Sequence, residues 1–331
     1  MNVLKKIKTK IFQFSSYLNS ICFSPVKELD KISFNKKIYF YSLVWGESFN
    51  SYFNFTLPSL LHKSNYTELV KNNFELFFIV YTKDSEDLIR IKYKDIISKY
   101  KYINFEIVEI NSQNRKEPRK IASIAIINMF ARCVKEKALF FMAPPDMIFG
   151  ASSIYNCVIS SFDKKKNFAA AHPRVTSKIL NCIDTPYSGG IPNSKLVSLA
   201  MRNQHHNFKF ADFSLDLNTA YAGISYSKIN ESLYSVISKL PTIFLVFPLK
   251  EDYDYFVKVD DFNMWDRGWL EKILKEDRVN VSGSSELFFT VELTDEAIKL
   301  KLRSGSTKKR ISDKIFPSRV LGIFTSVWHS S

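Results

Sequence analysis

Apolar residues follow two alternating patterns between residues 38 and 172. Apolar runs typical of strands occur at 38–45, 74–81, 103–110, 138–143 and 168–172. The run at 38–45 is rich in aromatic and β-branched residues and predicts a buried strand, whereas 103–110 alternates between apolar and polar residues. Between the runs, apolar residues recur at helical spacing, most clearly from Pro118 to Lys137. Strands that return about every 30 residues with helices between them predict an α/β fold, in which helices flank a mostly parallel sheet.

The pattern becomes less regular beyond residue 175. Helical spacing reappears near 193–204 and 228–239, and apolar runs at 242–247 and 287–293 predict two more strands. We therefore expect a regular first half joined to an irregular second half. No internal repeat divides the chain.

The carboxyl ends of the predicted strands are the first places to look for a ligand site, because parallel α/β sheets bind ligands beyond those ends. Polar or conformationally unusual residues stand at four of them. They are Trp45 and Gly46, Thr82 and Asp84, Asp146, and His172 with Arg174.

Asp146 follows an apolar run and two prolines, which restrict the backbone before it. A carboxylate at this position can ligate Mg²⁺ or Mn²⁺ bridging a diphosphate. It can also cap a helix that begins at Met147, and both roles are compatible. Basic residues at the start of the preceding helix, including Arg119 and Lys120, are candidates for phosphate contacts; the alternative is a solvated helix face.

The Gly-rich phosphate loops of common nucleotide-binding proteins are absent from the sequence. No G-x-G-x-x-G follows the first strand, and no G-x-x-x-x-G-K-[ST] occurs anywhere. A phosphate-bearing ligand would therefore need basic side chains or a metal. The four cysteines are widely spaced without a C-x-x-C pair, so we expect Cys133 and Cys157 to be buried thiols in a reducing compartment.

The net charge of +14 is concentrated at the two ends of the chain. Residues 1–27 carry five lysines and no acid, whereas residues 299–331 carry five lysines and three arginines against Asp313 alone. A nearly neutral middle argues against a nucleic-acid-binding protein, whose basic residues normally lie on the folded domain. Basic ends instead fit an anionic membrane surface or serve only solubility.

Apolar residues at both ends strengthen the membrane interpretation. The stripe Leu4, Ile7, Ile11, Phe14 and Leu18 has helical spacing and predicts a basic amphipathic helix that lies on a membrane or packs on its own domain. A second apolar face is predicted near the C-terminus at Val320, Leu321, Phe324, Val327 and Trp328. No apolar run is long enough to span a bilayer.

Several motifs, taken in order, resemble a known family. The first strand ends at Trp45-Gly46, and LPSLL (57–61), YTKD (81–84) and FFMAPPDMIFG (140–150) follow. Together these resemble the nucleotide-binding half of bacterial GT-A-type glycosyltransferases, and more narrowly a poorly characterised surface-glycan group. FPL at 247–249 and SSEL at 284–287 extend the resemblance over residues 38–295.

The resemblance implies a GT-A-like, Rossmann-type fold that binds a nucleotide-sugar and transfers its sugar to a glycan or lipid-linked glycan in surface polysaccharide synthesis. Trp45 with Gly46, or Thr82 with Asp84, would contact the base and ribose. Asp146, with or without Mg²⁺ or Mn²⁺, would handle the diphosphate. Asp146 stands alone where these enzymes usually have D-x-D, Phe247 replaces a histidine, and Ser285 replaces an aspartate. These departures leave metal dependence and the acceptor site open.

An inverting transferase also needs a base near the acceptor hydroxyl. Asp260, Asp261 and Glu286 are the candidates, although Asp260-Asp261 is equally typical of a turn. The alternative function is a non-catalytic nucleotide- or sugar-binding protein with a degenerate GT-A-like fold at the membrane surface. A methyltransferase would need a Gly-rich turn after the first strand, where only Gly46 occurs.

These expectations divide the chain into four parts. Residues 1–30 form the basic amphipathic helix, 31–175 the nucleotide-sugar-binding half, 176–298 the acceptor-side half, and 299–331 the basic membrane-associating segment. The expected location is cytoplasmic, peripheral on the inner face of the cell membrane.

Overall fold

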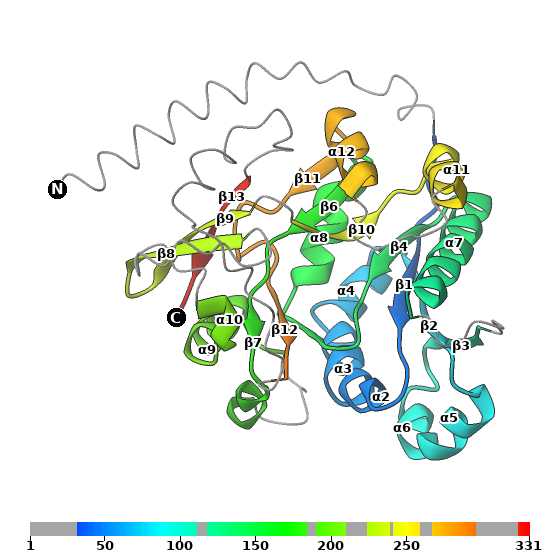
Figure 1. Cartoon of the computed structure of the whole chain (residues 1–331), viewed down its shortest axis with the longest axis horizontal. Helices are drawn as coiled ribbons and strands as arrows, with labels where there is room; N and C mark the ends of the chain where they lie inside the picture. The colour runs from blue at the N-terminus through cyan, green and yellow to red at the C-terminus, as the bar shows by residue number, and fades with distance from the viewer. Residues whose placement is uncertain are drawn as a thin grey trace.

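The computed structural model describes residues 32–110, 118–183, 190–209, 224–238, 241–258, 267–295 and 324–331. The predicted N-terminal helix and the acids Asp260 and Asp261 lie outside these residues, as does most of the C-terminal basic segment. Figure 1 shows a large sheet covered by helices on both faces, with a small sheet at the other end of the molecule.

The large sheet has seven strands in the order β11-β6-β10-β4-β1-β2-β3. β10 runs antiparallel to both of its neighbours, and the other described pairings in this sheet are parallel. The strands are β1 (Lys37–Leu43), β2 (Glu75–Thr82), β3 (Asn104–Glu109), β4 (Leu139–Met142), β6 (Asn167–Ala170), β10 (Thr242–Val246) and β11 (Val279–Val281). The predicted α/β class with a mostly parallel sheet is confirmed.

Helices fill most of the connections between strands. They are α2 (Ser48–Ser51), the π-helix η2 (Tyr52–Thr56), α3 (Leu57–Leu60), α4 (Tyr66–Lys71), α5 (Glu86–Lys92), α6 (Lys94–Lys99), α7 (Pro118–Glu136), α8 (Ser153–Phe162), the 3₁₀-helix η3 (Ser177–Cys182), α9 (Asn193–Arg202), α10 (His206–Lys209), α11 (Lys250–Lys258) and α12 (Arg267–Lys275). The π-helical turn precedes Pro58, where the sequence predicts a kink or boundary. None of the described helices is long and apolar enough for a membrane span.

Alternating residues of β1 point into two separate cores. Ile38 and Phe40 pack with residues of α2 to α6 and α8 on one face, while Tyr39 and Tyr41 pack with α7, α11 and α12 on the other. Figure 1 shows α7 and α11 on the face opposite α3 and α4. A sheet buried on both faces explains why its strands read as continuous apolar runs. Cys133 and Cys157 are buried free thiols, as predicted.

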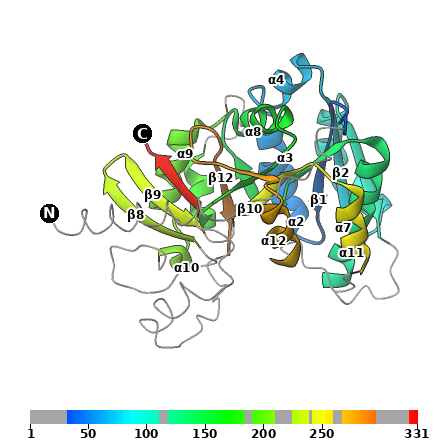
Figure 2. The same ribbon diagram turned by 90° about the horizontal axis from the view of Figure 1, so that it is seen from above.

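Two small sheets complete the fold. One has the order β5-β12-β7, formed by β5 (Met147–Phe149), β12 (Thr290–Leu293) and β7 (Arg174–Val175). The other has the order β13-β9-β8, formed by β8 (Ile224–Asn230), β9 (Leu233–Ser238) and β13 (Phe324–His329). Figure 2 shows the second of these set apart from β1 and β2.

Three sequence predictions differ from the structure, two in the irregular half and one at Met147. The helix predicted near 228–239 is the antiparallel hairpin of β8 and β9, whose alternating residues suit a sheet with one buried face. From the predicted C-terminal apolar face, Phe324, Val327 and Trp328 lie in strand β13 (Phe324–His329), where Trp328 is buried against Phe208 and Phe289 and not on an outward face, whereas Val320 and Leu321 lie outside the described residues. No helix begins at Met147, because Met147–Phe149 is a strand, so Asp146 is not a helix cap.

The division of the chain at residue 175 also fails to separate the large sheet from the rest. Strands β10 and β11, which come from the predicted acceptor-side half, belong to the large sheet.

A buried ion pair joins α11 to the residue that precedes β11. Arg278 donates to Asp252 over 2.5 Å, and Trp269 Nε1 donates to the same carboxylate over 2.9 Å. Buried pairs of this kind require such complete hydrogen bonding.

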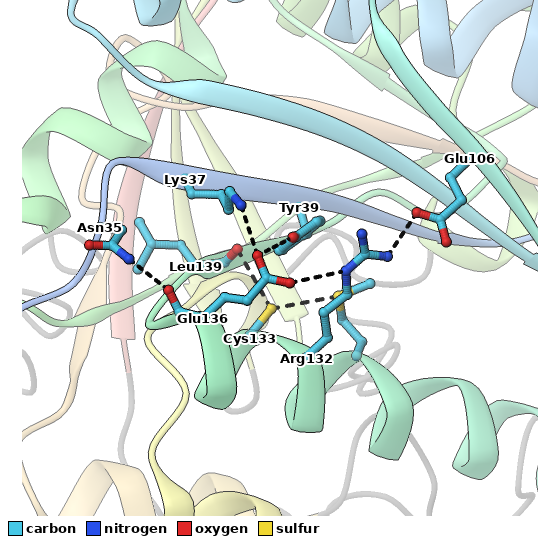
Figure 3. A network of polar contacts seen from close by, with 9 residues as sticks. Asn35, Lys37, Tyr39, Glu106, Arg132, Cys133, Glu136 and Leu139 are labelled. Atoms are coloured by element: carbon cyan, nitrogen blue, oxygen red, sulfur yellow. Dashed lines mark hydrogen bonds and ion pairs between the residues drawn. The ribbon is translucent and has the colours of Figure 1, made fainter.

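A second polar network ties α7 to β1 and β3 (Figure 3). Glu136 Oε2 accepts from Lys37 Nζ over 2.8 Å and from Tyr39 Oη over 2.6 Å. Arg132 pairs with Glu106 over 2.8 Å and lies 4.5 Å from the centre of the Tyr39 ring. Burial alone would raise the pKa of Glu136, but the hydrogen bonds from Lys37 and Tyr39 hold that pKa below its usual value. We call these residues the Glu136 network.

Candidate functional site at the carboxyl edge of the large sheet

Strands β1, β2, β4 and β6 run in the same direction, so their carboxyl ends lie at one edge of the sheet, here called the carboxyl edge. β1 continues to β2 on one side, whereas β4 pairs with β1 on the other side after the crossover through α7. The direction of winding therefore reverses between β1 and β4. Such a reversal opens a crevice at the carboxyl edge, where α/β sheets bind ligands.

The β1 side of this point is built around Gly46 and Asp84. The N–H of Gly46 donates to Asp84 Oδ2 over 2.6 Å, and the N–H of Asp84 donates to Thr82 Oγ1 over 3.0 Å. Gly46 has a φ of 55°, in the left-handed region that favours glycine. The contact joins the ends of two neighbouring strands. Thr82 is buried, whereas Gly46 is exposed.

Trp45 adds an aromatic surface beside this contact. Its side chain is partly exposed, and Lys83 Nζ lies 5.5 Å from the centre of its ring. A ring held in this way can stack on a base, and a nearby ammonium can meet negative charge. The structure thus brings together Trp45, Gly46, Thr82 and Asp84, which the sequence predicted separately.

The β4 side is built around Asp146. Pro144 and Pro145 carry the chain from β4 into β5, and the carbonyl of Asp146 accepts from the N–H of Leu293 over 2.7 Å. This bond places β12 beside Asp146. Because β12 pairs with both β5 and β7, it brings Glu292 between the chain that follows β4 and the chain that follows β6.

Glu292 is held by two cationic or potentially cationic partners. Its Oε1 lies 2.7 Å from Arg174 Nη2, and its Oε2 lies 3.1 Å from His172 Nε2. The second ring nitrogen of His172, Nδ1, is buried and has no hydrogen-bond partner among the described residues. We call Asp146, His172, Arg174 and Glu292 the carboxylate cluster.

The two carboxylates of this cluster have opposite pKa shifts. Burial and then the negative charge of Glu292 raise the pKa of Asp146 to about 7, although its own backbone hydrogen bond and Arg174 oppose the shift. Burial would also raise the pKa of Glu292, but the hydrogen bond and charge of His172 and the pairing with Arg174 hold its pKa below the usual value. Near neutral pH, Glu292 is ionised and Asp146 can carry a proton.

Asp146 is the residue at which the sequence predicts a metal ion. Within the described ranges, no group of three or more His, Cys, Asp or Glu side chains could hold one. Both oxygens of Glu292 are engaged by Arg174 and His172, whereas Asp146 makes a hydrogen bond with its own backbone and interacts with Arg174 through charge alone. The expectation of Mg²⁺ or Mn²⁺ at Asp146 stays a prediction, and no step below depends on it.

Two other predicted site residues, Glu286 and Lys120, lie at exposed positions of the described chain. Glu286 is exposed in the loop between β11 and β12, where its N–H donates to Ser284 Oγ over 3.1 Å. Lys120 is exposed in the first turn of α7. The side chain of Arg119 lies outside the described residues, as do Asp260 and Asp261.

Glu292 is the cluster residue that sequence reasoning missed. It lies in the apolar run LFFTVEL, which was read only as a strand. An ionisable residue inside an otherwise apolar strand needs a partner, because burying an unpaired charge is costly. That was the available signal, but its partners, His172 and Arg174, lie more than one hundred positions earlier in the chain.

Comparisons with known proteins give only distant structural likenesses. No family model matches the chain, and no curated protein matches its sequence. A crystal structure of S. aureus TarS 1–349 in complex with UDP is similar over 78% of this chain and 60% of that chain, with 10% identity and a TM-score of 0.39. Another TarS 1–349 structure is matched over 44% of this chain and 42% of that one, with 16% identity and a TM-score of 0.29.

A third similar structure is 4-diphosphocytidyl-2C-methyl-D-erythritol synthase from Anaerococcus prevotii. It covers 80% of this chain and 91% of that chain, with 14% identity and a TM-score of 0.38. The chain spans less than two thirds of either TarS structure. At these TM-scores the likenesses carry no functional argument.

Proposed function

We propose that this protein binds a nucleotide-sugar at the carboxyl edge of its large sheet and transfers the sugar to a glycan or lipid-linked glycan. The observation that carries the proposal is the pairing of two unlike half-sites across the point where the winding reverses. Trp45, Gly46 and Asp84 lie on the β1 side, and the carboxylate cluster lies on the β4 side. The resemblance of the sequence to GT-A-type glycosyltransferases supports the same function.

The β1 half-site would receive the nucleoside. The ring of Trp45 offers a stacking surface for the base. The Asp84 carboxylate, already held by the N–H of Gly46, can accept a hydroxyl proton of the ribose in a charge-assisted hydrogen bond. Lys83, close to Trp45, would offset part of the diphosphate charge.

The carboxylate cluster would receive the diphosphate and the sugar. Because the pKa of Asp146 is about 7, its protonated form can donate a hydrogen bond to a phosphate oxygen near neutral pH. Arg174 can contribute positive charge, although Glu292 neutralises much of it. Asp260, Asp261 and Glu286 remain the proposed candidates for the base that accepts the proton of the acceptor hydroxyl.

The deciding experiment compares Asp146→Asn with Asp146→Ala in a thermal-shift panel of UDP-, GDP-, CMP- and dTDP-sugars. Asparagine keeps a hydrogen-bond donor, so it should retain most of the shift given by the preferred donor, whereas alanine should lose it. Wild-type affinity should also fall as pH rises through 7, because Asp146 then loses its proton.

Adding Mn²⁺ separates this mechanism from metal-dependent binding. If binding requires Mn²⁺ and asparagine fails as badly as alanine, Asp146 acts as a metal ligand and the proton-donor role is wrong. If none of the four nucleotide-sugars shifts the melting temperature, the donor site is wrong. Release of free nucleotide in the presence of an acceptor then distinguishes a transferase from a binding protein.

The binding-protein alternative has one specific observation in its favour. Both oxygens of Glu292 are engaged, so this carboxylate is not free to act as a base. The binding-protein alternative would be favoured if the protein binds a donor but transfers its sugar to no acceptor. The variants Asp260→Ala, Asp261→Ala and Glu286→Ala should then bind the donor like wild type.

A further inference from the structure

Helix α5 carries apolar residues on two opposite sides. Ile89 is 4% exposed, and it joins Tyr93 in the core beneath the large sheet. Leu88 is 67% exposed and Ile91 is 73% exposed, the highest values among the exposed large apolar side chains of the described residues. At about 100° per residue, the Leu88–Ile91 side points roughly 150° away from the core side. The core contact of α5 therefore leaves this second apolar side unused.

Basic residues surround the exposed apolar pair. Lys92 ends α5, Lys94 begins α6, and both are exposed. Across 86–101, the basic residues outnumber the acidic ones: Arg90, Lys92, Lys94, Lys99 and Lys101 against Glu86, Asp87 and Asp95. Arg90 is already paired with Glu86 within the helix over 2.7 Å. With Arg90 and Glu86 set aside, the four lysines of this segment still outnumber the exposed Asp87 and Asp95, so the segment as a whole is positive.

From this geometry we infer that the α5–α6 surface, with Leu88 and Ile91 at its centre, docks on an anionic lipid surface. Apolar side chains enter the interface between headgroups and acyl chains, and neighbouring lysines meet the negative headgroups. An acidic protein partner would satisfy the charges equally, but two exposed aliphatic side chains among lysines match the mixed apolar and anionic character of a lipid interface.

Docking through α5 would place the candidate site at the carboxyl edge close to the membrane. α5 begins two residues after Asp84, so it starts at the carboxyl edge of the large sheet. At about 1.5 Å per residue, Leu88 lies within roughly one helical turn of that edge. A bilayer at Leu88 and Ile91 would hold the candidate site beside the membrane surface. The docking itself does not depend on whether the site is catalytic.

The test is sedimentation of the full chain with vesicles made of phosphatidylcholine and phosphatidylglycerol in equal parts. The double variant Leu88→Ser/Ile91→Ser should bind these vesicles about tenfold more weakly than wild type, because two aliphatic anchors are lost. The matched control is Ile229→Ser/Val257→Ser, which alters side chains 52% and 51% exposed on β8 and α11. The control should sediment like wild type. All four side chains are exposed, so both variants should fold.

Hydrogen exchange on the same vesicles locates the contact. Anionic vesicles should protect residues 86–99 in the wild type, and pure phosphatidylcholine should protect them much less. Lys92→Gln/Lys94→Gln should weaken binding to anionic vesicles only. If the Leu88→Ser/Ile91→Ser variant sediments like wild type, or if protection appears only elsewhere, the inference is wrong.

Two further readouts separate other occupants of this surface. A change in oligomeric state in the Leu88→Ser/Ile91→Ser variant, with vesicle binding intact, would assign the surface to a second copy and overturn the lipid proposal. The nucleotide-sugar thermal shift of this variant should match wild type. If no nucleotide-sugar binds but vesicle binding still depends on Leu88 and Ile91, the proposed function is wrong and the lipid-docking inference still holds.

Discussion

The Glu136 network and the carboxylate cluster are both built from charged side chains packed around the same large sheet, and they solve the problem of burial in opposite ways. Glu136 has cationic and hydroxyl partners, which lower its pKa (Figure 3). Asp146 instead faces the negative charge of Glu292, and its pKa is raised to about 7.

This difference indicates that the Glu136 network has a structural role and that the carboxylate cluster is the better candidate for a functional site. Every charge of the Glu136 network meets an opposite charge within the fold, so the network stabilises the joint between α7 and β1. The carboxylate cluster leaves Asp146 poorly compensated and His172 Nδ1 without a described partner. Strongly shifted pKa values and incomplete hydrogen bonding are typical of functional sites.

Asp146→Asn should have the largest effect of the four variants. It should make the protein more stable at pH 8, because it removes a buried carboxylate that has too few favourable partners. The unfolded pKa of an aspartate is about 3.9, so the folded state binds this proton more tightly, and stability falls as pH rises from about 4 through about 7. Above pH 7 the ionised carboxylate costs roughly 2–4 kcal/mol, and asparagine removes that cost. Urea unfolding at pH 5 and pH 8 measures it. An equal effect at both pH values would contradict the raised pKa.

Glu292→Gln should destabilise the fold by about 1.5–3 kcal/mol, because Arg174 and His172 lose a charged hydrogen-bond partner. It should also lower the pKa of Asp146, since one of the two causes that raise this pKa is removed. The pH-dependent loss of stability should then occur at lower pH than in the wild type. If that step stays in place, the two carboxylates do not interact.

Glu136→Gln should cost about 1–2 kcal/mol at pH 7, discounted for the partial exposure of the pair. The sign of its pH dependence is opposite to that of Asp146. The lowered pKa of Glu136 gives stability that is present above its unfolded pKa of about 4.3 and is lost as pH falls through the folded pKa. The variant and the wild type should therefore converge in acid. Donor-induced thermal shifts should be unchanged, and a reduced shift would link this network to the site.

Arg132→Lys should have the smallest effect, about 1 kcal/mol or less. Lysine keeps the charge that faces Glu106, but it lacks the planar group that also stacks on Tyr39. The urea midpoint should fall slightly with an unchanged slope. A loss as large as that of Glu136→Gln would show that the stacking on Tyr39 matters more than the ion pairs.

Most of the large sheet could be predicted from local patterns. The apolar runs at 38–45, 74–81 and 103–110 became β1, β2 and β3 with shifts of one or two residues at their ends. The signals for β1 and β2 were strong because both faces of these strands are buried, whereas β3 at the edge of the sheet is mostly half-buried and shows an alternating pattern. The helix predicted near 228–239 falls on the hairpin of β8 and β9, because partly exposed strands carry a weaker pattern that is easily confused with helical spacing.

The residues of the candidate site likewise fall into those that local sequence patterns predict and those that they do not. Gly46, Asp84, Asp146 and His172 could be selected from sequence because each stands at or just beyond the carboxyl end of a predicted strand, and the ends of parallel strands share one edge. Glu292 could not be selected in this way, because it lies within a strand whose neighbours were not predictable. The helix predicted to begin at Met147 is wrong for the same reason: Met147–Phe149 is a strand that pairs with β12, which lies far away in the sequence.

The sequence by itself determined the strand–helix alternation, the two-sided burial of the sheet and the polar residues at the strand ends, since these depend on spacing along the chain. Only the tertiary structure decided that β12 lies between β5 and β7, which brings Glu292 to His172 and Arg174 and makes Asp146 a carboxyl with a pKa of about 7. Charge interactions depend on distance in space and on burial, and neither can be read from positions separated by more than one hundred residues.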